Sequence, residues 1–347
     1  MREALFWERA NTADGASVDA AQGRAVRCTL CFHRCLVKEG AAGFCGVRVN
    51  REGTLFTLVD EEVASLALDP VEKKPLFHFL PGTATLSLGT LGCNFACKFC
   101  QNSRISRMPA DTGRFARGTR VTPKALADLA VREGAPSISC TYNEPTVFYE
   151  LVKGIGESAA EKGLKVILVT NGAMAREPLL CLKGLVHAAN VDLKSFNPAF
   201  YRDVCAGSLK TVLDNLVLMK EMGLWLEVTT LVIPGLNDSD EELREIAAFI
   251  RDNLGASTPW HVSAFFPCYQ MQDRPRTPPS TIHRACEIGR AEGLHYVYGG
   301  NVANREDEAT YCPHCHALCM ERSGFRVLTP CTGICPFCGT ALAGVWA

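Results

Sequence analysis

The stretch SLGTLGCNFACKFCQN, residues 87–102, decides which parallel fold the chain adopts. It joins a short apolar run to two glycines, Gly89 and Gly92, and then to three cysteines. A doubly wound dinucleotide-binding sheet would place a G-x-G-x-x-G turn after its first strand. Cysteines follow the two glycines here, which argues against that alternative.

Outward from this stretch, short apolar runs alternate with helical patterns. One helix is predicted to begin at Thr122 and Pro123, an N-cap residue followed by proline at the first helical position. Another is predicted within residues 237–255, with acidic residues in its first turn and Gly255 as its stop. The predicted strands are 85–90, 137–142, 165–170, 190–195, 225–233, 261–266 and 295–300.

This alternation predicts an α/β fold with a parallel sheet and right-handed crossovers. Nearly every polar motif follows a predicted strand. Active sites of (β/α) barrels are built at the C-terminal ends of their strands. We therefore expect a full or partial barrel rather than a doubly wound sheet.

Length and composition limit the classes of protein. The 347 residues are 47% hydrophobic, enough for one large domain with one or two small modules. The formal net charge of -1 indicates no nucleic-acid or membrane-surface partner. The charged start MREALFWERA is no signal peptide, and no apolar stretch reaches the roughly 18 residues of a spanning helix. We expect a cytoplasmic protein.

The eighteen cysteines form three groups. In a reducing compartment, clustered cysteines hold metals more often than disulfides. The groups are Cys28, Cys31, Cys35 and Cys45; Cys93, Cys97 and Cys100; and Cys312, Cys315, Cys319, Cys331, Cys335 and Cys338. The other five are predicted to be inert core residues: Cys140, Cys181, Cys205, Cys268 and Cys286.

The middle group has three cysteines instead of four. Electron carriers cap each iron of a four-iron cluster with a cysteine, so three cysteines leave one iron open. An open position distinguishes catalytic from structural metals, and a small molecule with an amine and a carboxylate can fill it. Phe99 places an aromatic ring beside this position. The alternatives are a chance cysteine-rich loop or part of a zinc site.

The segment CNFACKFC resembles the C-x3-C-x-aromatic-C pattern of radical S-adenosylmethionine (SAM) enzymes. The resemblance implies a partial (β/α)6-type barrel with a [4Fe-4S] cluster on Cys93, Cys97 and Cys100. It also implies that the reduced cluster cleaves SAM to a 5'-deoxyadenosyl radical, which abstracts a hydrogen atom from a substrate still to be identified. A reductant such as flavodoxin or ferredoxin would supply the electron.

The resemblance also assigns cofactor contacts to residues at strand ends. In TYNEPT, Asn143 and Glu144 would accept hydrogen bonds from the ammonium group of SAM, although Tyr142 and Asn143 replace the two glycines usual there. A second pair, Thr170 and Asn171, suits the ribose hydroxyls. The predicted cofactor-binding residues are Phe99, Asn143, Glu144, Thr170, Asn171, Asp192 and Lys194.

Lys194 needs an anionic partner if it is buried, and both the cofactor carboxylate and Asp192 qualify. Related enzymes often carry an arginine near the position of Thr229 and Thr230, so contacts to this carboxylate would differ here. Tyr269 and Asn301 are weaker pocket candidates. The pair Lys73 and Lys74 forms a solvated turn or holds an acidic substrate group at the barrel mouth.

Three flanking segments extend the resemblance to nearly the whole chain: CTLCFHRCLVKEGAAGFCGVR at 28–48, VEKKPLFHFLPGT at 71–83, and the C-terminal segment that begins with YCPHCHALCMERSGFRV at 311–327. They resemble the radical enzyme of the AmmeMemoRadiSam system, which implies AMMECR1-like and Memo-like companion proteins. The predicted division is a cysteine-motif region at 1–80, a radical SAM barrel at 81–303 and a zinc-ribbon-like module at 304–347. The alternatives are a glycyl-radical-enzyme activase of the pyruvate formate-lyase type and a non-catalytic iron-sulfur or zinc redox protein.

The two outer cysteine groups contain enough thiols for complete metal sites. Two C-x2-C pairs, Cys312 with Cys315 and Cys335 with Cys338, predict a structural zinc site, with a rubredoxin-like iron site as the alternative. Cys319 and Cys331 exceed the needs of one site. The first group, Cys28, Cys31, Cys35 and Cys45, would hold zinc or an iron-sulfur cluster, or consist of packed reduced thiols.

Overall fold

A computed structural model describes residues 1–10, 24–107, 118–302 and 304–346. Its centre is an eight-stranded sheet with the order β16-β15-β14-β13-β12-β11-β9-β8. The strands are β8 (Ser65–Pro70), β9 (Ala84–Gly89), β11 (Ser137–Cys140), β12 (Lys165–Thr170), β13 (Ala188–Asp192), β14 (Trp225–Val232), β15 (Trp260–Ala264) and β16 (Val297–Gly300).

Seven of these strands are parallel, and β8 pairs antiparallel with β9 at one edge. The spatial order follows the chain order, so all seven C-terminal strand ends lie at the same edge of the sheet. The predicted α/β class and mostly parallel sheet are confirmed, and each of the seven predicted strands is present. There is one more parallel strand than a (β/α)6 count, and β8 comes from the region predicted as residues 1–80.

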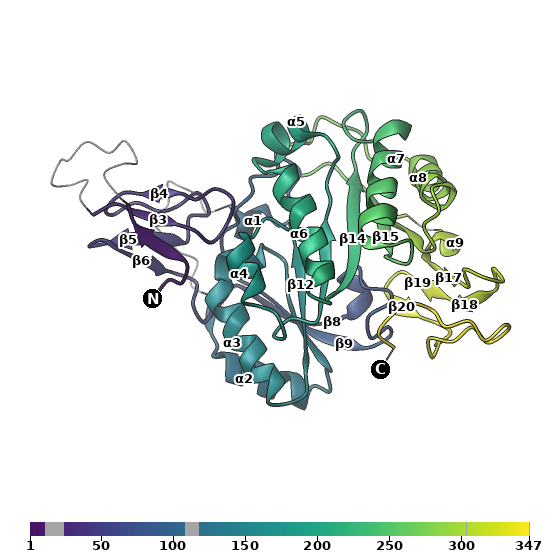
Figure 1. Ribbon diagram of the computed structural model, residues 1–347, viewed down its shortest axis with the longest axis horizontal. Coiled ribbons are helices and arrows are strands. Elements are labelled where there is room, and N and C mark those ends of the chain that lie inside the picture. Colours follow the sequence, from purple (N-terminus) through teal and green to yellow (C-terminus); the bar gives the residue numbers. More distant parts are fainter. Residues whose placement is uncertain (11–23, 108–117, 303, 347) are drawn as a thin grey trace.

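Helices follow most strands and cover one face of the sheet (Figure 1). Thr122 caps α2 by accepting a hydrogen bond from the backbone of Ala125 at 3.2 Å, as predicted. The second predicted helix, α7, continues as a π-helical turn to Gly255. The larger helices are α2 (Pro123–Arg132), α3 (Tyr149–Ala160), α4 (Arg176–Leu180), α6 (Leu209–Glu221), α7 (Asp240–Phe249), η5 (Ile250–Leu254) and α8 (Pro279–Ala291).

Shorter helical segments connect these elements. They are η2 (Val71–Lys73), α1 (Ser103–Ser106), η3 (Pro145–Phe148), α5 (Pro198–Phe200), η4 (Tyr201–Cys205) and α9 (Arg305–Glu308). The main core lies between the sheet and the helices, where β11 is buried along its whole length. Close packing there depends on Gly289 of α8, because a Cβ at that position would lie 2.9 Å from the ring of Trp260.

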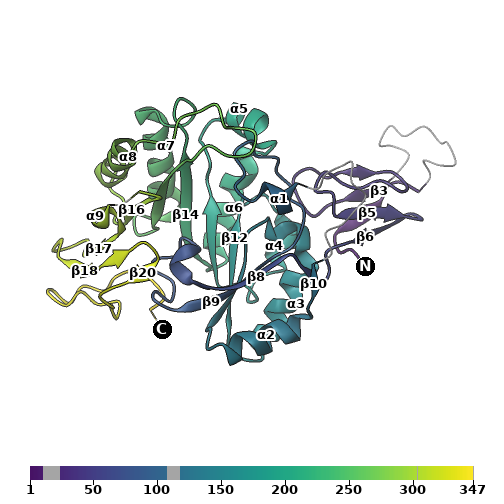
Figure 2. The same cartoon turned by 180° about the vertical axis from the view of Figure 1, so that it is seen from behind.

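Two small β-rich modules lie on opposite sides of the central sheet (Figures 1 and 2). The N-terminal module contains β1 (Arg2–Glu3), β2 (Trp7–Arg9), β3 (Val26–Cys28), β4 (Leu36–Val37), β5 (Arg48–Arg51) and β6 (Thr54–Thr57). The C-terminal module contains β17 (Thr310–Tyr311), β18 (Leu318–Met320), β19 (Arg322–Ser323) and β20 (Arg326–Val327). A separate ribbon pairs β7 (Glu62–Val63) with β10 (Thr119–Arg120). Each module carries one outer cysteine group.

None of the helices in the described part of the chain combines the length and apolar character needed to cross a bilayer.

Candidate active site

The loop after β9 carries Cys93, Cys97 and Cys100 at the C-terminal edge of the sheet. All three cysteines are free and partly buried. The backbone N–H of Phe95 donates to the sulfur of Cys93 at 3.3 Å, and Cys100 lies 3.1 Å from the hydroxyl of Ser106. Such hydrogen bonds to the sulfurs tune the potential of an iron-sulfur cluster.

The three sulfurs are spread too widely for one metal ion. In the part of the chain that the structure describes, the only group of three or more metal-ligating side chains whose ligand atoms all lie within 4.8 Å of one another is in the C-terminal module. A cluster of four irons separates its thiolates more than a single ion does, because each sulfur binds a different iron. The donor set therefore fits a cluster with three protein ligands.

Asn143 anchors this loop to the end of β11. Its Oδ1 accepts from the backbone N–H of Thr90 at 2.9 Å, and its Nδ2 donates to Gly92 O at 2.8 Å and to the Thr90 hydroxyl at 3.1 Å. The buried side chain is thus fully engaged in positioning the cysteine loop. Its predicted contact with SAM stays a prediction.

Tyr142 occupies the position where related enzymes usually have glycine. Its φ of 67° lies in the left-handed region that favours glycine. The conformation is held by the Tyr142 hydroxyl, which donates to Asp69 at 2.7 Å, and by the Lys74 ammonium, 4.7 Å from the ring centre. Lys74 is buried and lies 2.7 Å from Asp69, so the prediction of a solvated turn is wrong for this lysine.

Glu144 joins the ends of β11 and β12. One of its carboxylate oxygens accepts from the Thr170 hydroxyl at 2.7 Å, and the other accepts from the backbone N–H of Asn171 at 2.7 Å. Burial raises the pKa of Glu144, and these hydrogen bonds, with those from Thr146, oppose the rise. The structure therefore brings three of the predicted cofactor-binding residues together.

Asn171 connects this group to the cysteine loop. Its Nδ2 donates to Oδ1 of Asn94 at 2.8 Å and lies 3.9 Å from the sulfur of Cys93. The end of β12 is therefore next to the cluster loop, as the predicted cofactor site requires.

Asp192, the last residue of β13, and Lys194 lie side by side. Their charged groups are 2.7 Å apart, and the Lys194 ammonium is 5.7 Å from the centre of the Phe99 ring. Burial opposes the charge on Lys194, but Asp192 and Cys97 outweigh it and hold its pKa well above the ordinary value. Asp192 thus supplies the anionic partner that a buried lysine requires.

Cys205 and Cys268, which were predicted from the sequence to be inert core residues, lie against the cluster loop. The thiol of Cys268 donates to the backbone oxygen of Phe99 at 3.1 Å, and the backbone oxygen of Cys205 accepts from Ala96 at 2.8 Å. A hydrogen bond with the Cys205 thiol lowers the pKa of Cys97. The core prediction is wrong for exposed Cys181 and half-buried Cys268. The strand-end motif FFPCYQM was the available signal for Cys268, whereas nothing local marks Cys205.

The weaker candidates make mostly structural contacts. Thr229 donates to the side chain of Asn190 at 2.9 Å, and Thr230 donates to the backbone of Leu193 at 2.8 Å. Asn301 donates to the backbone of Ala264 at 3.0 Å, while Tyr269 is exposed.

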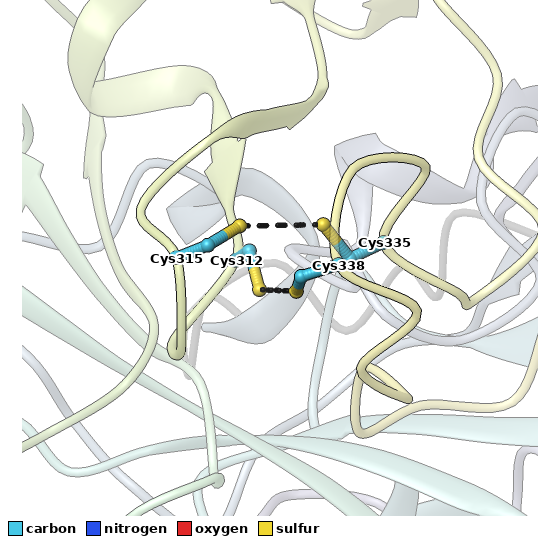
Figure 3. Close-up of side chains that lie close together, drawn as sticks. All are labelled: Cys312, Cys315, Cys335 and Cys338. Carbon is cyan, nitrogen blue, oxygen red and sulfur yellow. Dashed lines mark hydrogen bonds between the residues drawn. The ribbon is translucent and has the colours of Figure 1, made fainter.

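The C-terminal module gathers four thiols (Figure 3). Cys312 lies 3.6 Å from Cys338, Cys315 lies 3.6 Å from Cys335, and all four sulfurs are within 4.8 Å of one another. Four sulfurs about 2.3 Å from a tetrahedral zinc ion would be about 3.8 Å apart, so the geometry fits one ion. Outside this set, the thiols of two extra cysteines point to backbone oxygens: Cys319 to that of Ala317, and Cys331 to that of Ile334.

The N-terminal group of four cysteines lies beside the cluster loop. Cys28, Cys31, Cys35 and Cys45 are free and line one pocket together with Asn94, the residue after Cys93. The module docks on the end of β12 through backbone hydrogen bonds, from Phe32 to Ala173 at 3.4 Å and from Ala175 to Leu30 at 2.9 Å.

Comparisons with known proteins agree with this site. The model of the Radical SAM superfamily matches residues 87–250. Uncharacterized protein MJ0808 of Methanocaldococcus jannaschii is 43% identical over 343 residues, 98% of each chain. The pyruvate formate-lyase-activating enzyme of Streptococcus mutans is 24% identical over 169 residues, 46% of this chain and 63% of that enzyme. GTP 3',8-cyclase of Aquifex aeolicus is 27% identical over 174 residues, 48% of this chain and 51% of that enzyme. The chain belongs to the radical SAM superfamily and is a radical SAM enzyme.

Proposed function

We propose that this chain is the radical enzyme of an AmmeMemoRadiSam system and acts together with AMMECR1-like and Memo-like companion proteins. The resemblance of the flanking segments to that subgroup supports the assignment, and the extent of similarity separates the chain from the activase. The relative that is 43% identical matches 98% of the chain, including both cysteine-rich modules, whereas the pyruvate formate-lyase-activating enzyme matches 46%. The flanking modules therefore set this chain apart from that activase.

The chemistry depends on a cofactor pair that the cysteine loop is built to hold. A [4Fe-4S] cluster with SAM at its open iron supplies a carbon radical that removes a hydrogen atom from the substrate. Cys93, Cys97 and Cys100 would bind three irons, and a reduced flavodoxin or ferredoxin would supply the electron. Asn143 holds the backbone of this loop in place through Thr90 and Gly92.

The strand ends supply groups for the remaining parts of SAM. Lys194, next to Asp192 and Phe99, would face its carboxylate, and Glu144 would accept from its ammonium group. Thr170 and Asn171, which contact Glu144, would bind the ribose hydroxyls. The four C-terminal thiols would hold a structural zinc ion remote from this chemistry.

The test is reductive cleavage of SAM by the reconstituted full chain. The protein is loaded with iron and sulfide without oxygen, reduced, and given SAM. We expect one open cluster on the middle cysteines and the formation of 5'-deoxyadenosine. A fully loaded protein that forms no 5'-deoxyadenosine would overturn the proposed chemistry. SAM deuterated at the 5' position tests whether SAM is consumed or regenerated, because regeneration exchanges its deuterium for hydrogen from the substrate.

Adding the companion proteins tests the proposed system. We expect 5'-deoxyadenosine to form faster in their presence and deuterium to move from a labelled companion or its bound small molecule into the product. Equal rates with and without both companions would contradict this assignment.

The second candidate is a glycyl-radical-enzyme activase, which the similarity to the pyruvate formate-lyase-activating enzyme favours. An activase would generate a glycyl radical on a large partner protein, and electron paramagnetic resonance (EPR) detects that radical directly. The third interpretation, a non-catalytic redox protein, is dropped because the chain belongs to a superfamily of enzymes.

A further inference from the structure

The four N-terminal cysteines surround a single pocket. Cys28 ends β3, and the other three come from the loops before and after β4. All four line the pocket, together with Gly43 and Asn94. Thiols that are distant along a loop-rich segment therefore converge on one volume.

The spacing of these thiols does not suit a single ion. No three of them have sulfurs within 4.8 Å of one another, a condition that the C-terminal four meet. A tetrahedral zinc ion would require sulfurs about 3.8 Å apart. None of the four is in a disulfide. The pocket shares this wide spacing with the middle cysteine loop, which belongs to a four-iron site.

Three buried donor nitrogens at the pocket have no hydrogen-bond partner. They are Nε and Nη1 of Arg48 and Nδ2 of Asn94, and both residues line the pocket and are almost fully buried. Arg48 is otherwise engaged, with its guanidinium 3.2 Å from Glu150 and donating to the backbone oxygen of Leu5. A buried donor left without a partner destabilises the folded state. Sulfide and thiolate sulfurs of an anionic cluster would be acceptors for such donors.

The pocket touches the loop of the radical cluster. His33 lies 2.8 Å from the backbone oxygen of Asn94, the residue that follows Cys93. The loop and the module also meet at Gly92, where a Cβ would lie 2.6 Å from the backbone oxygen of Cys45. The backbone beside Cys93 is thus in contact with the backbone of the N-terminal cysteine group.

We propose that the N-terminal module binds a second iron-sulfur cluster of the four-iron type, with Cys28, Cys31, Cys35 and Cys45 as its ligands. It relays electrons to the radical cluster. A reduced low-potential flavoprotein or iron-sulfur protein gives it one electron, and it is then oxidised again as that electron passes to the middle cluster. No bond forms or breaks in this step. The relay rests on the proposed function, whereas the metal assignment does not.

The assignment is tested by removing the other cluster. The full chain with Cys93→Ala, Cys97→Ala and Cys100→Ala is reconstituted without oxygen, and its iron, sulfide and zinc are counted. We expect about four irons per chain and an EPR signal after reduction that SAM does not change. Absence of iron, or a second zinc ion in its place, overturns the assignment.

A second variant keeps the assignment testable if the first one fails to fold. Cys31→Ser with Cys35→Ser, both partly exposed, should lower the iron content from about eight to about four per chain. An unchanged iron content overturns the assignment. The matched control is Cys181→Ser, an exposed cysteine outside all three groups, which should leave both the iron content and the EPR signal unchanged.

The same double variant tests the relay. We expect 5'-deoxyadenosine formation to fall at least about tenfold when a flavodoxin donates the electron, and to fall much less when dithionite reduces the middle cluster directly. If the rate of 5'-deoxyadenosine formation falls equally with both reductants, the relay is overturned. The metal assignment is then decided by the iron content alone. Failure of the wild-type protein to cleave SAM would instead count against the proposed function.

Discussion

The middle and the C-terminal cysteine centres differ in how far their sulfur atoms are spread. Cys93, Cys97 and Cys100 are close in sequence, yet their sulfurs do not all lie within 4.8 Å of one another. The two C-terminal pairs are separated by nineteen residues between Cys315 and Cys335. All four of their sulfurs nevertheless lie within 4.8 Å of one another. Closeness along the chain therefore does not decide the size of a metal site.

What decides the size is how the backbone presents the thiols. Two C-x2-C turns from separate segments face one another and enclose a small volume suited to one ion (Figure 3). The middle cysteines instead follow one another around a single loop, which β11 and β12 hold through Asn143 and Asn171. Three cysteines on this loop would leave one iron of a four-iron cluster open to a ligand from solution.

The largest effect is expected when the middle cysteine centre is disrupted and the C-terminal centre is left intact. Cys97→Ala should abolish SAM cleavage and leave the proposed zinc site occupied, because the four C-terminal thiols lie in a separate module. The rate of 5'-deoxyadenosine formation and the zinc content are measured together. The control Cys181→Ala should retain both, and simultaneous loss of zinc in Cys97→Ala would show that the centres are not independent.

The reverse experiment disrupts the proposed zinc site. If the four C-terminal thiols hold zinc, Cys312→Ser should release the ion and unfold the C-terminal module, since metal binding supplies about 10 kcal/mol or more of folding free energy to small zinc modules. Limited proteolysis should then cut within residues 304–346 and spare the barrel. SAM cleavage by the spared barrel is expected to persist; its loss in proportion to the zinc would give the module a catalytic role.

Asn143→Ala sharpens the comparison by loosening the middle loop alone. It removes three hydrogen bonds and leaves buried groups of Thr90 and Gly92 without partners, which should destabilise the loop by about 2 kcal/mol. We expect faster loss of iron to a chelator, with zinc unaffected. Asn215→Ala is the matched control, because it removes buried asparagine bonds to Gly172 and Met174 instead.

The smallest expected effect concerns the junction of the C-terminal module with the barrel. Buried His78 lies 2.7 Å from the backbone oxygen of Ala343 and 2.5 Å from the hydroxyl of Tyr298. Burial lowers its pKa to about 4, so the unfolded chain binds the proton more readily than the folded one. Stability should fall as the pH drops from about 6.5 towards 4, by about 1 kcal/mol at pH 5.5.

Chemical denaturation at pH 7.5 and 5.5 measures this effect. His78→Gln should weaken the pH dependence, because glutamine does not titrate. If the free energy of unfolding of the variant depends on pH as strongly as that of the wild type, the dependence comes from other groups, such as the four C-terminal thiols.

The sequence alone determined the local features. Alternating apolar runs predicted all seven parallel strands, because a strand buried on both faces leaves a continuous apolar signal. The spacing of Cys93, Cys97 and Cys100 predicted an open cluster, and the resemblance placed Glu144, Thr170 and Asn171 at neighbouring strand ends. These inferences needed only short stretches of chain.

The tertiary structure alone decided which distant groups meet. It excluded Cys319 and Cys331 from the four-thiol site, placed Cys205 beside Cys97, and buried Lys74 against Asp69. It also set the N-terminal thiols beside the cluster loop. Crossover connections and the docking of modules produce such contacts, and their outcome depends on packing between segments far apart in sequence. Residue spacing therefore predicted the candidate ligands, and the folded chain determined which of them lie together.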